Sequence, residues 1–277
     1  MLEPAAGSGP DLPYVSIVTP TYGRSDTLLR AARSAADQIG VRVEHIVVGD
    51  RCPLLAGLEP ALRAINPDIV ILHLPPCSAP WCDYLSARIA RARNVGIAAA
   101  SGDYVCQLDS DNTLDPDHAV SLVAAIEGMP GAVGAVCGRK LLFSDGRPFD
   151  LPYHPWGATL EDAAEIWRRL RALGVYRDGS HLATERLAFD GVPFGVDADE
   201  IMLRRAAHQR YLFPADFTPD EVAEGVGEDD LLSFRLLEDG CAIAHSERHT
   251  LNFYLGGEFT ARIEAEALGS LAGPPSQ

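Results

Sequence analysis

Short apolar segments alternate with segments of helical periodicity over the first half of the chain, and this alternation limits the folds available to it. Apolar runs predict strands at residues 15–19, 43–48, 69–74 and 104–108. Helical spacing of apolar residues predicts helices at 28–38, capped by Ser25, at 84–100, and at 116–127, with Pro116 in the first turn. Such an alternation predicts an α/β fold with a mixed, mostly parallel sheet sandwiched between helices.

Polar residues follow three of these predicted strands. They lie at residues 19–22, 49–50 and 109–111, each at the carboxyl end of a strand. Ligands of open α/β sheets bind beyond the carboxyl ends of the strands, so these residues are expected to line one ligand site.

The segment GDYVCQLDSDN, residues 102–112, is the most informative of the strand ends. Its apolar run leads directly into Asp109 and Asp111, with Ser110 between them. Alternate residues of an extended segment point the same way, so both carboxylates can face one pocket. Two carboxylates that close repel each other unless a cation lies between them, and a hard divalent cation that also holds a phosphate meets this need. The segment therefore predicts a place where metal and phosphate meet.

Composition narrows the classes of function. The net charge of -16 and the pI near 4.8 argue against nucleic acid as a partner, because a phosphate backbone requires a basic face. No apolar run approaches the roughly 18 residues of a membrane span. The start of the chain lacks a signal-peptide pattern, and the six cysteines show no disulfide-framework spacing, which predicts free thiols in a cytoplasmic protein.

The chain is expected to form a single domain at residues 13–269, between a disordered lead-in at 1–12 and a flexible tail at 270–277. Beyond Lys140, further helices are predicted at 161–173, near 198–208 and from 228, and a strand-like segment reads AHSERHTLNFYL. The stretch 143–159 is rich in aromatic residues. It is consistent with a well-packed irregular loop, and equally with a lid or acceptor wall over the pocket.

Four segments in order resemble family 2 glycosyltransferases of the GT-A (Rossmann-like) fold. They are VSIVTPTYGRSDTL, VEHIVVGDRC, RARNVGIAAASGDYVCQLDSDNTLDPDH and GEDDLLSFRLLEDG, and the resemblance covers residues 14–256. The second segment departs from the family pattern, because Gly49 replaces its first acid while Asp50 keeps the second. The resemblance implies an enzyme that moves a sugar from a nucleoside-diphosphate sugar to an acceptor, with inversion in one displacement. UDP and GDP sugars are the candidate donors.

The resemblance also implies roles for the nucleotide half, residues 14–115. Pro20, Thr21 and Tyr22 would lie beside the base, and Asp50 would accept a hydrogen bond from a base N–H, which uracil and guanine both offer. The remaining implied contacts are Arg93 to the diphosphate, Asp111 to the metal, Asp109 to the ribose or the metal, and Ser110 to the nucleotide sugar. Mn²⁺ or Mg²⁺ on the diphosphate would stabilise the leaving group as a Lewis acid. For Arg93 the alternative is an exposed helix arginine without a role.

The acceptor half, roughly residues 140–256, would supply the catalytic base. By resemblance, Asp229 removes the proton of the attacking acceptor, Glu228 orients the acceptor or the pocket, and Gly195 admits the acceptor, with Trp156 on its wall. Acids in the first turn of a helix are also favoured by the helix dipole alone, and Asp230 makes the choice of Asp ambiguous. The acceptor is left open as a small molecule, a glycan or a lipid-linked molecule with an oxygen, nitrogen or sulfur nucleophile, and the oligomeric state is left open too.

One family feature is displaced in this sequence. Many relatives carry a late histidine that completes the metal shell, and Phe253 and Tyr254 occupy that spacing here. His249 is the candidate third ligand; the alternative is that no protein group fills this position and that water does.

Two other functions use the same residues. DSDNTL also fits the DxDxT motif of haloacid-dehalogenase-type phosphatases, with Asp109 as nucleophile and Asp111 as acid/base. That motif belongs near the first strand and needs a later lysine. Here two strands with their own matching motifs, at 15–19 and 43–48, come first, and Lys140 is the sole lysine. The third possibility is a non-catalytic nucleotide-sugar-binding protein.

Overall fold

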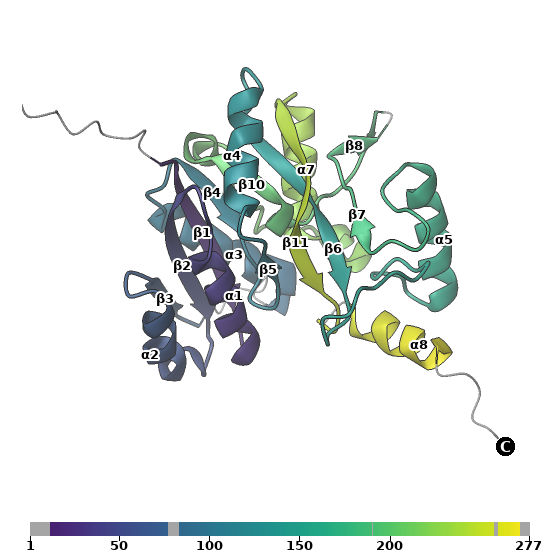
Figure 1. The fold of residues 1–277 in the computed structure, drawn as a ribbon, viewed down its shortest axis with the longest axis horizontal. Coiled ribbons are helices and arrows are strands. Elements are labelled where there is room, and N and C mark those ends of the chain that lie inside the picture. Colours follow the sequence, from purple (N-terminus) through teal and green to yellow (C-terminus); the bar gives the residue numbers. More distant parts are fainter. Residues whose placement is uncertain (1–11, 77–82, 190, 258–259, 272–277) are drawn as a thin grey trace, which may run out of the picture.

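The computed structural model describes residues 12–76, 83–189, 191–257 and 260–271. Within these residues the fold is a nine-stranded mixed sheet with helices on both faces (Figure 1). Its strands run in the order β3-β2-β1-β4-β10-β6-β11-β5, with β7 paired to β6. The strands are β1 (Tyr14–Thr21), β2 (Arg42–Asp50), β3 (Val70–Leu74), β4 (Tyr104–Gln107), β5 (Thr113–Leu114), β6 (Gly134–Leu142), β7 (Leu182–Ala183), β10 (Ile201–Arg204) and β11 (Ile243–Tyr254).

The strands β3, β2, β1 and β4 are parallel, and this half of the sheet is the one expected from the alternation of elements. The other half is mixed: β10 is antiparallel to both β4 and β6, β6 is parallel to β11, and β5 is antiparallel to β11. A separate hairpin joins β8 (Ala188–Phe189) to β9 (Val192–Pro193). The carboxyl ends of β1, β2 and β4 therefore meet at one edge, as predicted.

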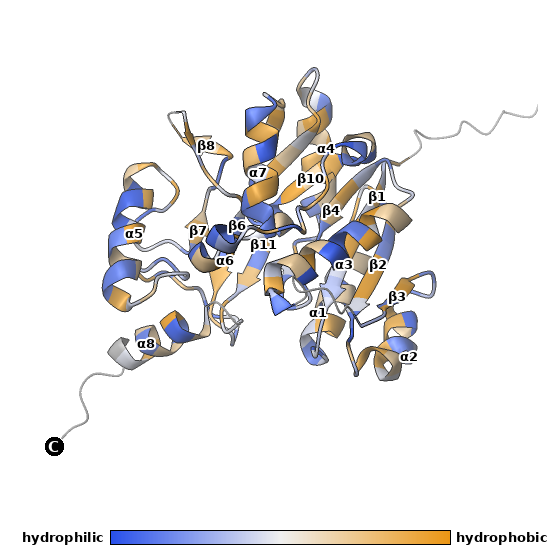
Figure 2. Ribbon diagram, turned by 180° about the vertical axis from the view of Figure 1, so that it is seen from behind, coloured by the Kyte–Doolittle hydropathy of each residue, from blue (hydrophilic) through white to orange (hydrophobic). Residues whose placement is uncertain are grey.

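Helices cover both faces of the sheet. They are α1 (Asp26–Ala36), α2 (Leu55–Ile65), α3 (Leu85–Ala99), α4 (His118–Gly128), α5 (Leu160–Ala172), α6 (Pro219–Glu224), α7 (Glu228–Glu238) and α8 (Ala261–Leu271), with 3₁₀ turns at Ala198–Glu200 and Arg205–Gln209. One buried cluster joins α1 and α4 to one face, and another joins α3 and α7 to the other. Side chains alternate across β1, so Ile17 packs into the first cluster and Val18 into the second. Figure 2 shows the apolar strands between these layers.

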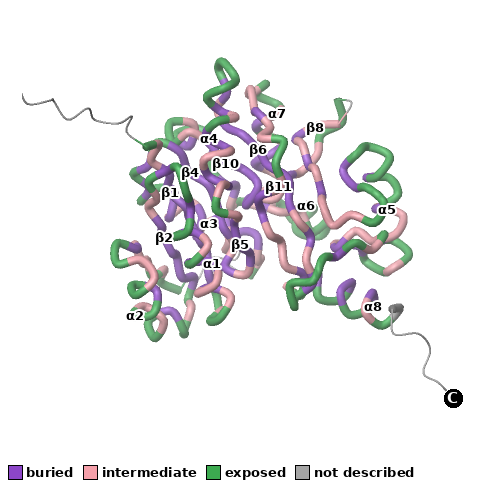
Figure 3. The backbone as a smooth tube through the Cα atoms, in the orientation of Figure 1, coloured by how far each residue is buried: buried purple, intermediate pink, exposed green. Residues whose placement is uncertain are grey.

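A third buried cluster supports the part of the molecule that carries α5 and α8. Phe143 and Phe149 of the aromatic stretch belong to it, with their rings 5.1 Å apart at 71°. The outward sides of α5 and α8 are exposed (Figure 3). The packed-loop interpretation is thus correct for these two phenylalanines. No helix among the residues described here is long and apolar enough to cross a membrane.

The prediction of a helix near residues 198–208 is wrong. Residues 201–204 form β10, which lies between β4 and β6 and has short 3₁₀ turns on either side. Ile201 and Leu203 pack into the buried cluster on one face of the sheet, and Met202 packs into the other. Burial on both faces removes the period-two pattern that identifies a half-exposed strand, so sequence periodicity could not reveal this element.

Other predicted boundaries change in smaller ways. The helix α2 was not predicted and contains Pro60, and α4 begins after Pro116 rather than with Pro116 in its first turn. Ser25 precedes α1 but its side chain makes no capping bond. The helix α8 includes residues 270 and 271 of the predicted tail, while residues 1–11 and 272–277 lie outside the described residues.

Candidate functional site at the carboxyl edge of the sheet

Two adjoining cavities open at the carboxyl edge of the sheet. The first, here called the β1–β2 cavity, has a volume of about 200 Å³ and is lined by Pro20, Thr21, Tyr22, Asp50, Ser110 and Asp111, among others. The second, the α7 cavity, has a volume of about 440 Å³ and is lined by Arg93, Arg139, Gly195, Asp197, Glu228 and Asp229, among others. Asp109 and Trp156 line both. The sequence-predicted residues thus gather at one place, with the exception of His249.

The two carboxylates of the DSD segment each have an arginine partner. Asp109 accepts from Arg93 Nη2 at 2.8 Å, and Asp111 Oδ2 lies 3.2 Å from Arg24 Nη2. Burial raises the pKa of Asp109 well above its usual range, although Arg93 opposes the shift. Burial also raises the pKa of Asp111, against the effect of Arg24. Both arginines thus favour the charged carboxylates that a cation would need.

Arg93 is buried, and the alternative of an exposed helix arginine is therefore wrong. Besides Asp109, it contacts Glu228 at 3.2 Å and Asp199 at 3.7 Å. Burial alone would lower the pKa of Arg93, but these three carboxylates raise it, so the guanidinium stays charged. Arg93 thus connects the DSD segment to the first turn of α7.

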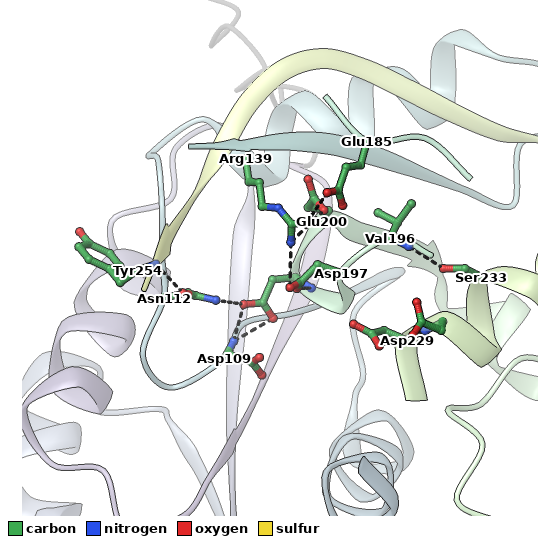
Figure 4. A network of polar contacts seen from close by, with 12 residues as sticks. Asp109, Asn112, Arg139, Glu185, Val196, Asp197, Glu200, Asp229, Ser233 and Tyr254 are labelled. Carbon is green, nitrogen blue, oxygen red and sulfur yellow. Dashed lines mark hydrogen bonds and ion pairs between the residues drawn. The ribbon is translucent and has the colours of Figure 1, made fainter. Parts of the chain in front are cut away.

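Asp199 was not identified from the sequence, although it holds the DSD segment in place. Its side chain is buried and accepts from the backbone N–H of Asp109 through both oxygens, at 2.9 and 2.8 Å. It also accepts from Asn112 Nδ2 at 2.9 Å, and Asn112 Oδ1 in turn accepts from the backbone N–H of Tyr254. These bonds link the turn after β4 to the 3₁₀ turn before β10 and to the end of β11 (Figure 4).

A second buried arginine, Arg139 on β6, organises the far wall of the α7 cavity. It pairs with Glu185, with Asp197 at 3.1 Å and with Glu200 at 3.7 Å. Figure 4 shows these side chains converging on the Arg139 guanidinium, with Asp229 across from them at the start of α7. Burial raises the pKa of Glu200 well above its usual range, with Glu185 adding to the shift against Arg139. The only hint of this cluster around Arg139 in the sequence is the segment VDADE, which contains three acidic residues.

The acidic segment before and within the first turn of α7 faces the α7 cavity. Glu228 is buried against Arg93, and Asp229 lines the cavity with Oδ1 accepting from the backbone N–H of Asp230. Burial raises the pKa of Asp229 well above its usual range, and Glu228 and Asp197 raise it further. Asp230 instead accepts from the N–H of Gly227 as a helix cap.

Gly195 and Trp156, the two predicted acceptor residues, both line the α7 cavity. A Cβ on Gly195 would lie 1.8 Å from Asp230 Oδ1, so a larger residue here would require the Asp230 side chain to shift. The Trp156 ring lies 5.1 Å from the Phe253 ring at a tilt of 54° and faces the Arg139 guanidinium at 4.7 Å. Trp156 forms part of the cavity wall, and its contact with an acceptor stays a prediction.

The β1–β2 cavity contains the residues predicted to meet the nucleotide. Asp50 accepts from Arg88 Nε and pairs with Arg88 Nη2, both at 2.7 Å, and the exposed Tyr22 ring lies 5.0 Å from the Arg88 guanidinium. Thr21 Oγ1 is buried and has no hydrogen-bond partner among the residues that the structure describes. A Cβ on Gly49 would lie 2.5 Å from Leu55 Cδ2 of α2. A larger residue at this position would require the Leu55 side chain to shift.

His249 lies apart from the other predicted ligands. Its Nε2 bonds to Thr184 Oγ1 at 2.7 Å, and it lines neither cavity. It precedes Tyr254 by five positions on β11, roughly 16 Å along the strand. Phe253, Tyr254 and Gly257 come to the β1–β2 cavity instead, and a Cβ on Gly257 would lie 3.5 Å from Asp111 Oδ2.

The donor groups at Asp109 and Asp111 fit a hard divalent cation that is shared with a phosphate. Both side chains offer carboxylate oxygens, which Mg²⁺ and Mn²⁺ prefer. No group of three His, Cys, Asp or Glu side chains in the described part of the chain is arranged to hold a metal by itself.

Comparisons with known proteins agree with this geometry. A family model described as glycosyl transferase family 2 matches residues 86–209. The chain is 36% identical over 149 residues to the succinoglycan biosynthesis protein ExoO of Rhizobium meliloti (strain 1021), covering 53% of this chain and 38% of that protein. It is 31% identical over 157 residues to the putative teichuronic acid biosynthesis glycosyltransferase TuaG of Bacillus subtilis (strain 168), covering 54% of this chain and 57% of TuaG.

Solved structures share the fold. S. aureus TarS 1-349 in complex with UDP-GlcNAc superposes with a TM-score of 0.55 at 18% identity, over 90% of this chain and 60% of that one. The mannosyltransferase PcManGT from Pyrobaculum calidifontis, in complex with GDP-Man and Mn²⁺, gives a TM-score of 0.54 at 13% identity, over 98% and 68%. These matches confirm the predicted GT-A fold. The family model and the two relatives show that the chain is similar to glycosyl transferase family 2 over part of its length.

Proposed function

We propose that this protein transfers a sugar from a nucleoside-diphosphate sugar, held in the β1–β2 cavity, to an acceptor held in the α7 cavity. The single observation that carries this proposal is the shared wall of the two cavities. Asp109 lines both of them, Asp111 faces the first, and Asp229 faces the second. A donor and an acceptor would therefore meet at the metal motif, with a carboxylate base on the acceptor side.

The donor side has the groups that a nucleotide needs. Tyr22 offers an exposed ring, Thr21 a hydroxyl without a partner among the described residues, and Asp50 a carboxylate oriented by Arg88. UDP and GDP are the candidate nucleotides, because TarS is described with UDP-GlcNAc and PcManGT with GDP-Man and Mn²⁺. A divalent cation bound at Asp109 and Asp111 would supply Lewis-acid stabilisation of the leaving diphosphate.

On the acceptor side, Asp229 is the proposed general base. It takes the proton of the acceptor hydroxyl, amine or thiol as that group attacks the anomeric carbon and the bond to the diphosphate breaks in a single, inverting displacement. The raised pKa of Asp229 suits this role, because a base works best when its pKa approaches the working pH. Glu228 is held by Arg93 and positions the first turn of α7 beside the metal motif.

The phosphatase alternative is disfavoured by the position of Lys140. Its Nζ pairs with Asp115 Oδ2 at 2.5 Å, and it lines neither cavity with Asp109. Asp109 itself is engaged by Arg93 rather than free to attack a phosphate. The experiment below distinguishes the proposed enzyme from a non-catalytic nucleotide-sugar-binding protein.

Calorimetric titration of UDP and GDP, each with and without Mn²⁺, tests donor binding, and release of the nucleotide from UDP or GDP sugars tests turnover. We expect metal-dependent binding of one nucleotide. Asp229→Asn should keep that binding and lower turnover by about 10²–10⁴-fold, the usual contribution of a general base. Asp230→Asn is the matched control and should retain turnover. Equal turnover in wild type and Asp229→Asn would refute the base assignment, and binding without any turnover would indicate the non-catalytic binder.

A further inference from the structure

Three carboxylates face the β1–β2 cavity, and each is paired with a different arginine. Asp50 pairs with Arg88, Asp109 with Arg93 and Asp111 with Arg24. The three arginines differ in how firmly they are held, and this difference bears on what happens when a cation and a diphosphate enter the cavity.

Arg93 and Arg88 are held firmly. The Arg93 side chain is 3% exposed and lies among Asp109, Asp199 and Glu228. The Arg88 side chain is 17% exposed and presents both Nε and Nη2 to Asp50. Moving Arg93 would leave buried carboxylates without a counter-charge. Arg88 is fixed by its two contacts with Asp50, which also has Arg51 Nε at 3.7 Å.

Arg24 is held by one contact. Its side chain is 38% exposed, and the 3.2 Å pair with Asp111 is its single ion pair in the described part of the chain. It follows Gly23, whose φ of 64° makes a tight turn after β1, and it lines the β1–β2 cavity itself. The Asp111 side chain is 26% exposed, and a single ion pair that is open to solvent on the arginine side contributes little to stability, so it can exchange partners readily.

Asp111 does not depend on Arg24 for its position. The backbone oxygen of Asp111 accepts from Arg30 Nη2 at 2.7 Å, and the Arg30 guanidinium stacks 3.7 Å from the centre of the Tyr254 ring. Arg24 therefore neutralises the Asp111 carboxylate, whereas Arg30 fixes the position of the Asp111 backbone.

From these contacts we propose that Arg24 is an exchangeable counter-cation, a role that rests on the proposed nucleotide-sugar function. It pairs with Asp111 while no metal is bound, and a divalent cation displaces it from that carboxylate. The released guanidinium remains in the cavity, where its planar fork of N–H donors suits the oxygens of a diphosphate. Arg24 thereby opposes binding of the metal alone and favours binding of the metal together with the nucleotide.

The test measures binding rather than turnover. Mn²⁺ alone is titrated into the protein and followed by the electron paramagnetic resonance signal of free Mn²⁺, and UDP or GDP is then titrated by calorimetry at saturating Mn²⁺. Arg24→Gln should tighten binding of Mn²⁺ alone by about two- to five-fold, because a competing cation is gone. The same variant should weaken nucleotide binding in the presence of Mn²⁺ by about tenfold or more, because a charge-assisted hydrogen bond is lost.

Two further variants separate this role from general charge effects. Arg33→Gln removes the same charge from an exposed position on α1 that lines neither cavity, and it should change neither affinity. In an Asp111→Asn background, Arg24→Gln should no longer tighten binding of Mn²⁺ alone, because its partner is absent.

Several results would overturn the proposal. They are weaker binding of both Mn²⁺ and nucleotide in Arg24→Gln, unchanged binding of Mn²⁺ alone, or equal tightening in Arg33→Gln. Each of these leaves the proposed function standing if the wild type binds nucleotide with Mn²⁺. A wild-type protein that binds neither UDP nor GDP with Mn²⁺ would overturn both the role of Arg24 and the proposed donor site.

Discussion

At the scale of single residues, two buried arginines give the site its shape. Arg93 and Arg139 lie on α3 and β6, and each gathers carboxylates from distant parts of the chain. A buried charge is tolerable only when it is paired, and removing one partner of such a pair typically costs about 3–5 kcal/mol. The carboxylates around the α7 cavity are therefore held by their arginines as much as by the strands and helices that carry them.

Asp199 shows how such a residue can act on the site without facing a ligand. We expect Asp199→Asn to turn an amide N–H₂ toward the N–H of Asp109 or the amide of Asn112, both of which are donors. The mismatch should lower the free energy of unfolding by about 1–3 kcal/mol and weaken nucleotide binding with Mn²⁺. Chemical denaturation and calorimetry measure the two effects. Asp68→Asn, an exposed change of the same charge, should alter neither, and unchanged nucleotide affinity in Asp199→Asn would contradict a positioning role.

At the scale of elements, the closest contact between α3 and the sheet determines how near Arg93 lies to the strand ends. Gly96 is the point of closest approach, because a Cβ there would lie 2.3 Å from Val18 Cγ1 on β1 and 3.2 Å from Val48 Cγ2 on β2. The helix gives up some intrinsic helix propensity at this position. In return, α3 lies directly on the two strands whose ends form the β1–β2 cavity.

Two Gly→Ala substitutions separate the effect of close helix–sheet packing on stability from the effect of helix propensity. Gly96→Ala should destabilise the protein by about 1–3 kcal/mol, because the added methyl group must displace packed side chains. Gly57→Ala, in α2 with no atom within 4 Å of the added Cβ, should stabilise it by up to about 1 kcal/mol. Thermal and urea unfolding of both variants measure the difference. Stabilisation by Gly96→Ala would show that α3 can move away from the sheet at no cost.

At the scale of the whole molecule, stability at acid pH depends on histidines enclosed in the core. His45 on β2 is buried, and its Nε2 bonds to Thr19 Oγ1 at 2.9 Å. Burial lowers the pKa of His45 to about 4. Between about pH 6.5 and pH 4 the unfolded chain binds a proton that the folded chain does not, so this stabilisation is lost as the pH falls through that window. The shift corresponds to about 3 kcal/mol.

Urea unfolding at pH 7.5 and pH 4.5 tests this dependence with His45→Gln. We expect the variant to be less stable than the wild type by about 1–2 kcal/mol at pH 7.5, and the deficit to shrink or reverse at pH 4.5. The buried carboxylates with raised pKa values change stability in the opposite direction, but they are common to both proteins and cancel in the difference. His73→Gln changes an exposed imidazole and is the control. A difference that does not change with pH would rule out a neutral, buried His45.

The sequence by itself determined the parallel half of the sheet, the GT-A fold and the residues at the strand ends. Apolar runs, helical spacing and the motifs after β1, β2 and β4 are local patterns, and neighbouring residues suffice to express them. The partner residues were decided by the tertiary structure alone. Asp109 and Asp199 are 90 positions apart, Arg93 and Glu228 are 135 apart, and β10 inserts between two strands from elsewhere in the chain. Burial and pairing of this kind depend on which surfaces meet when the chain folds, and no local pattern in the sequence records that choice.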